Sequence, residues 1–207
     1  EASEVVKKVA IETKLLYSPY FSERTGNKVY LKPENMQVTG AYKIRGAYYK
    51  ISTLSDEERS KGLITASAGN HAQGVAYAAK AYGVKAVIVM PTTTPLMKVE
   101  RTKSYGAEVV LHGDVYDEAC EYAYKLAEEH GYTFIHPFND LDVATGQGTI
   151  AMEIIKELPT SRMCPSLSTS MTPKRCPMLT PVRVAILPCC LWNATSASRS
   201  TLETPSP

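Results

Sequence analysis

The amino-acid sequence predicts an α/β fold: an open parallel sheet with helices on both faces. From residue 63 onward, apolar runs of strand length alternate with longer segments of helical period. Parallel neighbours need a crossover between them, usually a helix, so this alternation favours a parallel sheet. The expected strands are 63–66, 85–90, 107–111 and 132–135, and the expected helices are 71–82, 95–105, 114–130 and 143–158.

Residues at the helix ends carry further signals. Gly83 and Gly131 follow two of the expected helices, and glycine readily takes the left-handed conformation that ends a helix. Asp114 precedes the second of these helices, and we expect its side chain to cap the first turn.

The residues before 63 predict three more elements. Periodic apolar residues within 1–15 indicate an amphipathic helix, and residues 28–32 alternate as a strand with Val29 and Leu31 on one face. Pro33 is expected to end this strand. Residues 42–54 then fit a helix whose buried face holds Ile44, Ala47, Tyr48 and Ile51.

Composition and charge exclude several functional classes. With 207 residues, 44% of them hydrophobic, and a net charge of +2, the chain is an ordinary globular protein, and we expect no nucleic acid or membrane partner. The histidines and cysteines lack metal-ligand spacing, so no metal is expected. The chain begins at Glu1 without an apolar signal segment, which predicts a fragment of a cytoplasmic protein.

The composition changes abruptly near Pro159. All 12 glycines and all 13 tyrosines precede residue 161, whereas four of the 5 cysteines and seven of the 13 prolines follow it. Residues 161–207 hold five basic residues and one acidic residue, and only residues 182–187 form an apolar run of strand length. We expect an atypical tail here, a frame-shifted translation, a foreign splice or a disordered segment, which does not join the fold.

Residues 39–47, Thr-Gly-Ala-Tyr-Lys-Ile-Arg-Gly-Ala, place Lys43 between Gly40 and Gly46 at the start of a helix. A lysine amine loses its proton when desolvated and is the usual side chain that forms a Schiff base with an aldehyde cofactor. Taken alone, Lys43 would be an ordinary solvated lysine. The rest of the chain decides between these interpretations.

Residues 67–71 leave an expected strand and begin an expected helix. Ligands of parallel sheets bind at the carboxyl ends of the strands, and a helix N-terminus offers N–H groups to carboxylate or phosphate. Ser67 and Asn70 add polar side chains, although either could simply cap the helix. Residues 146–151 imitate a dinucleotide fingerprint, but no strand directly precedes them and no acidic partner follows, so no NAD site is expected.

Several blocks, taken together, resemble a known family. The sequence is similar to pyridoxal-phosphate enzymes of the tryptophan-synthase-β fold (fold type II), and within them to the threonine/serine dehydratase (threonine ammonia-lyase) group. The similarity covers residues 1 to about 160. The blocks that carry it are residues 31–37, 39–47, 67–74, 90–91, 106–109 and 146–151.

The resemblance implies roles for individual residues. Lys43 would bind pyridoxal 5'-phosphate covalently and remove the substrate Cα proton, Asn70 would hydrogen-bond the ring hydroxyl, and Tyr42 would wall the ring. The substrate carboxylate would lie on the loop formed by Ser67, Ala68, Gly69, Asn70 and His71.

The implied reaction is β-elimination of hydroxide from L-threonine or L-serine, which gives a 2-oxo acid and ammonia. The resemblance further implies an amino-acid substrate, a place in isoleucine biosynthesis and a homo-oligomeric intact parent. Residues 1–50 and 141–160 would belong to a large cofactor domain, and residues 51–140 to a small α/β domain.

Two alternatives stay open. Serine racemases carry a second serine where this chain has Ala68, so elimination is favoured over racemisation. The chain has no glycine after Gly148, whereas the family continues with a glycine-rich turn for the cofactor phosphate. The second alternative is therefore a catalytically inactive fragment or a small-molecule binding module.

Overall fold

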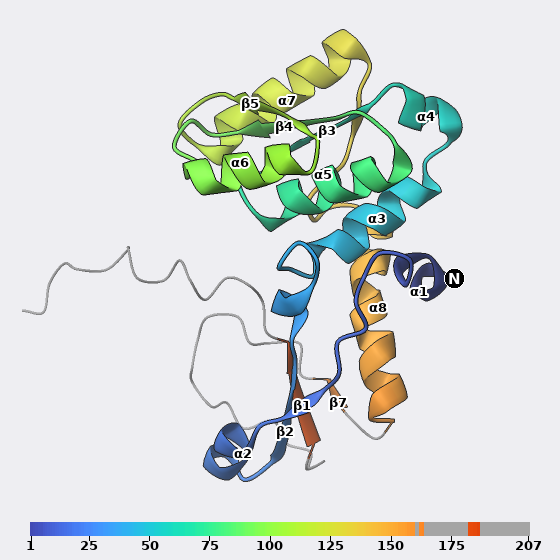
Figure 1. Cartoon of the computed structure of the whole chain (residues 1–207), viewed down its shortest axis with the longest axis vertical. Helices are drawn as coiled ribbons and strands as arrows, with labels where there is room; N and C mark the ends of the chain where they lie inside the picture. The colour runs from blue at the N-terminus through green and yellow to red at the C-terminus, as the bar shows by residue number, and fades with distance from the viewer. Residues whose placement is uncertain (160–161, 164–181, 187–207) are drawn as a thin grey trace, which may run out of the picture.

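The computed structural model describes residues 1–159, 162–163 and 182–186, which form two sheets and a set of helices (Figure 1). The strands are β1 (Leu16–Tyr17), β2 (Lys28–Lys32), β3 (Leu63–Ala66), β4 (Ala86–Met90), β5 (Glu108–Leu111), β6 (Thr133–Phe134), β7 (Arg162–Met163) and β8 (Val182–Ile186). The helices are α1 (Ala2–Val6), α2 (Pro19–Thr25), the 3₁₀ helix η1 (Glu34–Met36), α3 (Lys43–Thr53), α4 (Asp56–Ser60), α5 (Asn70–Tyr82), α6 (Leu96–Ser104), α7 (Tyr116–His130) and α8 (Leu141–Glu157).

The predicted parallel sheet is confirmed. Its strand order is β5-β4-β3-β6, and every neighbouring pair is parallel. On one face, Leu63, Ile88 and Met90 pack against α3 and α5; on the other, Ile64 and Val89 pack against α7. Figure 1 shows α7 on one side of this sheet and α5 and α6 on the other, as the alternation of strands and helices required.

A second sheet has the strand order β1-β2-β8-β7. The strand β1 runs antiparallel to β2, and β8 pairs with β2 in parallel along its whole length, from Lys28↔Val182 to Lys32↔Ile186. This pairing counts against the expectation that no part of residues 161–207 joins the fold. The other residues of that tail lie outside the described part of the chain.

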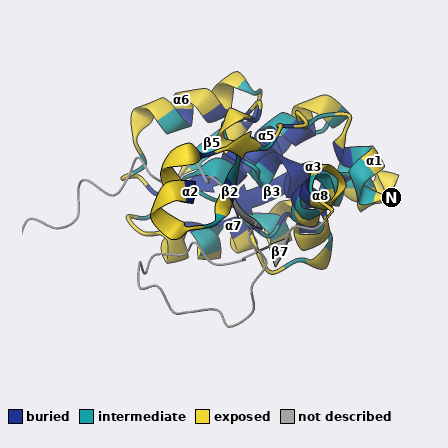
Figure 2. Ribbon diagram, turned by 90° about the horizontal axis from the view of Figure 1, so that it is seen from below, coloured by how far each residue is buried: buried dark blue, intermediate teal, exposed yellow. Residues whose placement is uncertain are grey.

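Helix α3 lies between α5 and α8, and glycines allow the close approach. A Cβ added at Gly146 of α8 would lie 2.7 Å from the Arg45 carbonyl oxygen and 2.7 Å from the Gly46 Cα. On the opposite side of α3, a Cβ added at Gly74 of α5 would lie 3.1 Å from the Lys43 carbonyl oxygen. The buried face of α3 predicted from its apolar period is confirmed, and Figure 2 shows dark blue, buried residues along α3, α5 and β3.

At the helix ends, the predicted glycine stops are confirmed, whereas the predicted N-cap of α7 is wrong. Gly83 and Gly131 end α5 and α7 with φ of 66° and 73°, as predicted. Asp114 does not cap α7, because that helix begins at Tyr116 and its N-cap is Val115. The Asp114 carboxylate instead accepts a hydrogen bond from the Thr92 hydroxyl at 2.8 Å, which ties it to the loop after β4.

The spacing of apolar residues did not predict two short helices, α2 and α4. The short helices α2 and α4 are set by serine caps: the Ser18 hydroxyl accepts from Phe21 N, and Ser55 forms a capping box with Glu58. The N-terminal amphipathic helix is shorter than the period suggested, since α1 ends at Val6.

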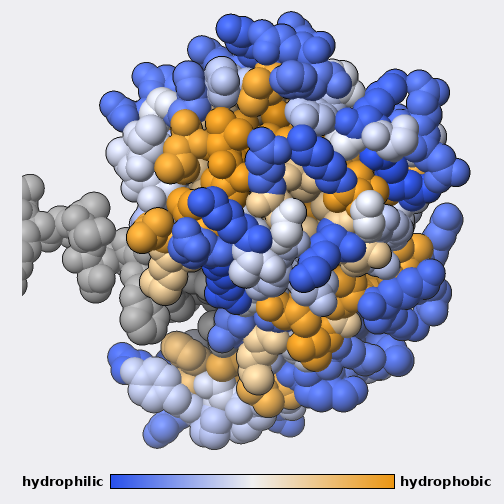
Figure 3. All heavy atoms as spheres, turned by 45° about the horizontal axis from the view of Figure 1, so that its top comes forward, coloured by the Kyte–Doolittle hydropathy of each residue, from blue (hydrophilic) through white to orange (hydrophobic). Residues whose placement is uncertain are grey.

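Large apolar side chains interrupt the polar surface in Figure 3. Among the described residues the most exposed are Leu141 at 83%, Met97 at 80% and Leu96 at 72% of their full area. Exposed apolar side chains gathered in patches mark surfaces that pack against other protein segments. No helix in the described part of the chain combines the length and apolar character that crossing a bilayer requires.

Candidate active site

Lys43 is the first residue of α3, and its side chain is half-buried. Its Nζ donates a hydrogen bond to the Pro137 carbonyl oxygen at 2.8 Å and lies 5.8 Å from the centroid of the Tyr42 ring. The amine therefore points into the protein, toward the segment that follows β6. The Tyr42 ring in turn packs against Ile150 and Ile154 of α8.

The predicted anion loop, residues 67–71, connects β3 to α5. The Ser67 hydroxyl accepts a hydrogen bond from Gly69 N at 3.2 Å, which shapes the turn, and Asn70 begins the helix. Among the residues that the structure describes, no side chain caps the N-terminus of α5, and a Cβ added at Gly69 would meet none of them within 4 Å. The first N–H groups of α5 thus border open space, where a carboxylate or phosphate is favoured. Ser67, Ala68, Gly69 and Asn70 are all half-buried.

The structure brings Lys43 and the loop together. The second turn of α5 packs against the first turn of α3 at the Gly74–Lys43 contact described above. Both also reach the segment after β6: Lys43 binds the Pro137 carbonyl, while the Ile135 carbonyl receives the Thr65 hydroxyl at 2.7 Å and His71 Nε2 at 3.2 Å. This segment was not anticipated, because its contribution is made by backbone oxygens, which leave no residue signature.

His71 is the most deeply buried residue of the loop, with 3% of its surface exposed. Burial lowers the pKa of its imidazole from 6.5 to about 4, against the opposing hydrogen bond to the Ile135 carbonyl and with help from the Lys43 and His136 charges. The ring is therefore neutral at pH 7 and donates from Nε2. Its Nδ1 has no hydrogen-bond partner among the described residues.

We expect His71 to lower the stability of the fold in mild acid. The unfolded imidazole takes up a proton near pH 6.5, whereas the folded one takes it up only near pH 4, so the unfolded state binds more protons between these values. The free energy of unfolding therefore does not depend on His71 protonation above pH 6.5. It decreases as the pH falls from 6.5 toward 4, because protonation then favours the unfolded state. Urea unfolding of the wild type and of His71→Gln at pH 7 and pH 5 measures this, with a smaller loss expected in the variant. An imidazole that titrates near its ordinary pKa in an NMR experiment would contradict the expectation.

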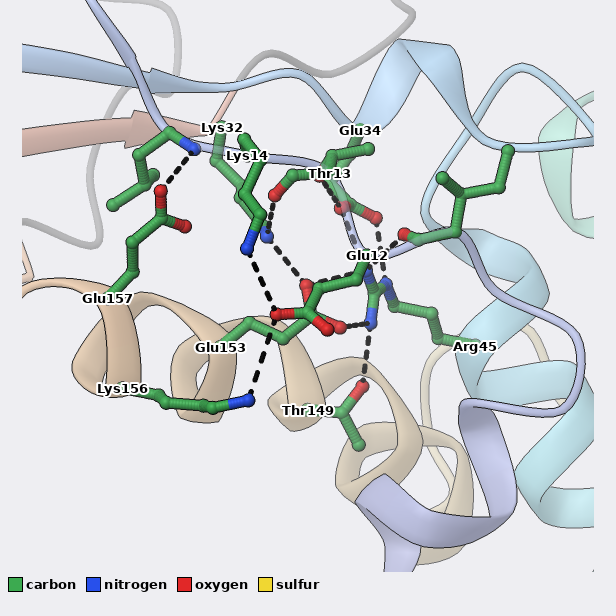
Figure 4. Close-up of polar contacts among 12 residues, drawn as sticks. Glu12, Thr13, Lys14, Lys32, Glu34, Arg45, Thr149, Glu153, Lys156 and Glu157 are labelled. Carbon is green, nitrogen blue, oxygen red and sulfur yellow. Dashed lines mark hydrogen bonds and ion pairs between the residues drawn. The ribbon is translucent and has the colours of Figure 1, made fainter.

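A cluster of charged residues surrounds Arg45, which stands two residues after Lys43 in α3 (Figure 4). Arg45 donates to both oxygens of Glu34, at 2.8 and 3.0 Å, and to both oxygens of Glu153, at 2.6 and 3.0 Å. Lys32 donates to Glu153 at 2.6 Å. Arg45, Lys32 and Glu34 are completely buried, and two cations face two carboxylates, so the cluster is neutral.

The charges of this cluster stabilise one another. Burial acts to raise the pKa of the Glu153 carboxyl, but hydrogen bonds from Arg45 and Lys32 outweigh it and leave that pKa below its ordinary value. Burial likewise acts to lower the pKa of Arg45, and its bonds to Glu34 and Glu153 raise it instead. Lys32 is completely buried at the end of β2, which the alternation of Val29 and Leu31 in that strand did not predict.

Comparisons with known proteins agree with this geometry. The family model described as "Pyridoxal-phosphate dependent enzyme" matches residues 6–169, most of the chain. The chain belongs to this family. The resemblance inferred from the motifs is therefore confirmed, and the α/β architecture is that of the family.

Curated relatives within the family share close to half of their aligned residues with this chain. The L-threonine ammonia-lyase of Thermotoga maritima is 54% identical over 159 residues, which cover 77% of this chain and 40% of that protein. The L-threonine dehydratase catabolic TdcB of Staphylococcus aureus is 50% identical over 159 residues, covering 76% of this chain and 46% of that protein. The chain thus spans less than half the length of these relatives.

Solved structures of family members have the same fold. The processed form of threonine deaminase isoform 2 from Solanum lycopersicum has a TM-score of 0.74 and 47% identity, over 76% of this chain and 46% of that one. Maize serine racemase has a TM-score of 0.75 and 36% identity, over 78% of this chain and 49% of that one.

The residues present fit the reactive end of pyridoxal phosphate. A half-buried lysine amine is directed inward beside an uncapped helix N-terminus, and the buried His71 Nδ1 has no partner among the described residues. These are the groups that an aldehyde and an anionic ligand require. In the described part of the chain, no group of histidine, cysteine and acidic residues could hold a metal ion.

Proposed function

We propose that this chain carries the lysine and the substrate loop of an enzyme that eliminates hydroxide from L-threonine or L-serine, with release of a 2-oxo acid and ammonia. The observation that supports the proposal is the contact of α5 with the start of α3 at Gly74, together with the hydrogen bonds of Lys43 and His71 to the same segment after β6. Relatives named threonine ammonia-lyase and threonine dehydratase support the choice of reaction.

Each residue of the site has a task that its position supports. Lys43 would hold the cofactor and take the proton from the substrate Cα, because its amine points inward beside the loop. The N–H groups at the start of α5 would bind the substrate carboxylate, with Ser67, Ala68, Gly69 and His71 forming the loop around it. Asn70 would bond the cofactor ring hydroxyl, and Tyr42 would flank the ring.

Pyridoxal phosphate, when bound, supplies the electron sink that makes the Cα proton acidic. The protein's own contribution is orientation: the loop holds the carboxylate while Lys43 faces the proton to be removed. The loop thereby selects an α-amino acid as substrate.

Serine racemase is the second candidate, since maize serine racemase shares this fold at 36% identity. Racemisation needs a second acid on the opposite side of Cα to return the proton. Ala68 has no ionisable group to do so, and the proposal therefore favours elimination.

Lys43→Ala tests the assignment of the lysine. We expect pyridoxal phosphate added to the wild-type chain to give the absorbance of a lysine-bound cofactor, and borohydride reduction followed by peptide mass spectrometry to locate it at Lys43. The variant should lose this band because it lacks the amine proposed to bind the cofactor. The matched control is Lys80→Ala, which removes an exposed lysine from the last turn of α5 and should keep the band.

Formation of 2-oxobutyrate from L-threonine tests the reaction itself. We expect little from this chain alone, which holds no glycine after Gly148 for a phosphate turn, and ready turnover from a chain of the relatives' full length. Cofactor distributed over several lysines, or a band that survives in Lys43→Ala, would refute the assignment and favour a non-catalytic binding module.

The domain division and the physiological setting are further parts of the proposal. The presence of two separate sheets supports a large domain from residues 1–50 and 141–160 and a small one from residues 51–140. We propose a homo-oligomeric, cytoplasmic parent enzyme with an amino-acid substrate. A role in isoleucine biosynthesis competes with threonine breakdown, because the S. aureus relative is named catabolic.

A further inference from the structure

The buried Glu34–Arg45 pair brackets the segment that carries Lys43. Glu34 is the first residue of η1, two positions after the end of β2, and Arg45 stands in the first turn of α3. The two meet in a fork: Arg45 Nε donates to Glu34 Oε2 at 2.8 Å and Nη2 donates to Oε1 at 3.0 Å. Two parallel bonds of this kind fix direction as well as distance. The pair therefore closes the loop of residues 34–45 at its base.

Both ends of this closure are held from outside the loop. Glu34 also accepts the Thr13 hydroxyl at 3.0 Å and the Gln37 amide at 3.2 Å. Arg45 is bound on its other side by Glu153 of α8. Neither end can shift without breaking charged hydrogen bonds that are shielded from water.

The loop between the two partners contains a flexible turn. It passes through Gly40 with φ of 75°, and glycine leaves a loop free to change shape. Lys43 follows this turn and stands two residues before Arg45 along α3. The fork thus joins the two ends of the loop that carries the lysine.

We propose that Glu34 and Arg45 are positioning residues, which close the Lys43 loop and thereby hold the lysine amine against the Pro137 carbonyl. The role we assign to this positioning, to present the amine to an aldehyde cofactor beside residues 67–71, rests on the proposed function. The positioning of the amine by Glu34 and Arg45 does not depend on that function. Glu153 binds the same guanidinium from α8 and anchors Arg45 to that helix, whereas the bond between Glu34 and Arg45 alone joins the two ends of the loop.

Competitive acylation tests the proposal on the whole chain without cofactor. Limiting acetic anhydride is added, and peptide mass spectrometry compares the modification of Lys43 with that of exposed Lys80 in the same molecules. We expect wild-type Lys43 to react about tenfold more slowly than Lys80, because a hydrogen-bonded, half-buried amine reacts through local opening. In Glu34→Gln the ratio should rise about tenfold toward that of Lys80.

Glu153→Gln is the matched control, because it removes the charge of the other carboxylate bound to Arg45 and leaves the loop closure intact. Its ratio should stay within about twofold of wild type. Equal ratios in the two variants, or no change in Glu34→Gln, would overturn the proposal. So would a Glu34→Gln chain without native circular dichroism, since the pair would then be a requirement of folding.

The outcome is independent of the proposed function, since acylation needs neither cofactor nor substrate. A raised ratio in Glu34→Gln, combined with no cofactor absorbance in the wild type, would sustain the positioning role and refute the enzyme. Cofactor bound at Lys43 with unchanged ratios would do the reverse.

Discussion

Arg45→Met is expected to lower the free energy of unfolding by about 3–5 kcal/mol, because removing one partner of a buried ion pair leaves uncompensated charge inside the protein. Arg45 binds Glu34 and Glu153 through four hydrogen bonds, and Glu34 is completely buried. Lys32 neutralises only one of the two carboxylates that would remain. Urea unfolding followed by far-ultraviolet circular dichroism at pH 7 measures the loss.

The matched comparison is Lys125→Met, which removes an exposed pair. Lys125 lies 3.9 Å from Glu129, both side chains are more than half exposed, at 66% and 51%, and such pairs contribute about 0–1 kcal/mol. A loss of less than about 1 kcal/mol in Arg45→Met as well would show that water reaches the cluster or that the carboxyls take up protons instead. Either result would remove the physical basis for a fixed charge network around Arg45.

The regular elements could be predicted from sequence because local signals and burial agree there. The strand β3 is a short apolar run covered on both faces, and α5 has a buried alanine face and a glycine at its end. Each feature leaves a mark at fixed spacing in the sequence. Asp114 shows where such signals fail. An aspartate can cap a helix but can also accept hydrogen bonds elsewhere, and here its carboxylate binds the Thr92 hydroxyl.

The candidate site was predictable only in part. The rule that parallel strands end at one edge places residues 67–71 in a crevice, and the motif singles out Lys43. The partners of Lys43 and His71 could not be read in this way, because Pro137 and Ile135 contribute carbonyl oxygens that every residue possesses.

The buried charged cluster could not be predicted from the sequence either. Lys32, Glu34, Arg45 and Glu153 are brought together over 121 positions of sequence, and each alone resembles a surface residue. Their burial is favourable only as a set, since any one of them without its partners would be destabilising. Spacing along the chain carries no information about such a set.

Close helix contacts are the other feature that sequence period does not reveal, and Gly146→Ala is expected to expose it. Alanine is the better helix former, yet its Cβ would lie 2.7 Å from the Arg45 carbonyl oxygen and 2.8 Å from the Tyr49 Cβ. Because backbone cannot move aside cheaply, α8 must shift away from α3. We expect the free energy of unfolding to fall by about 2–3 kcal/mol, measured by urea unfolding.

Gly148→Ala is the control in the same helix, two residues further on. A Cβ at this position would meet nothing within 4 Å, so the substitution should raise the free energy of unfolding by about 0.5–1 kcal/mol. Opposite signs in one helix separate packing from helix propensity, because propensity alone predicts a gain at both positions. Two gains would mean that α8 does not press on Arg45 and Gly46, and that α3 is free to move together with its lysine.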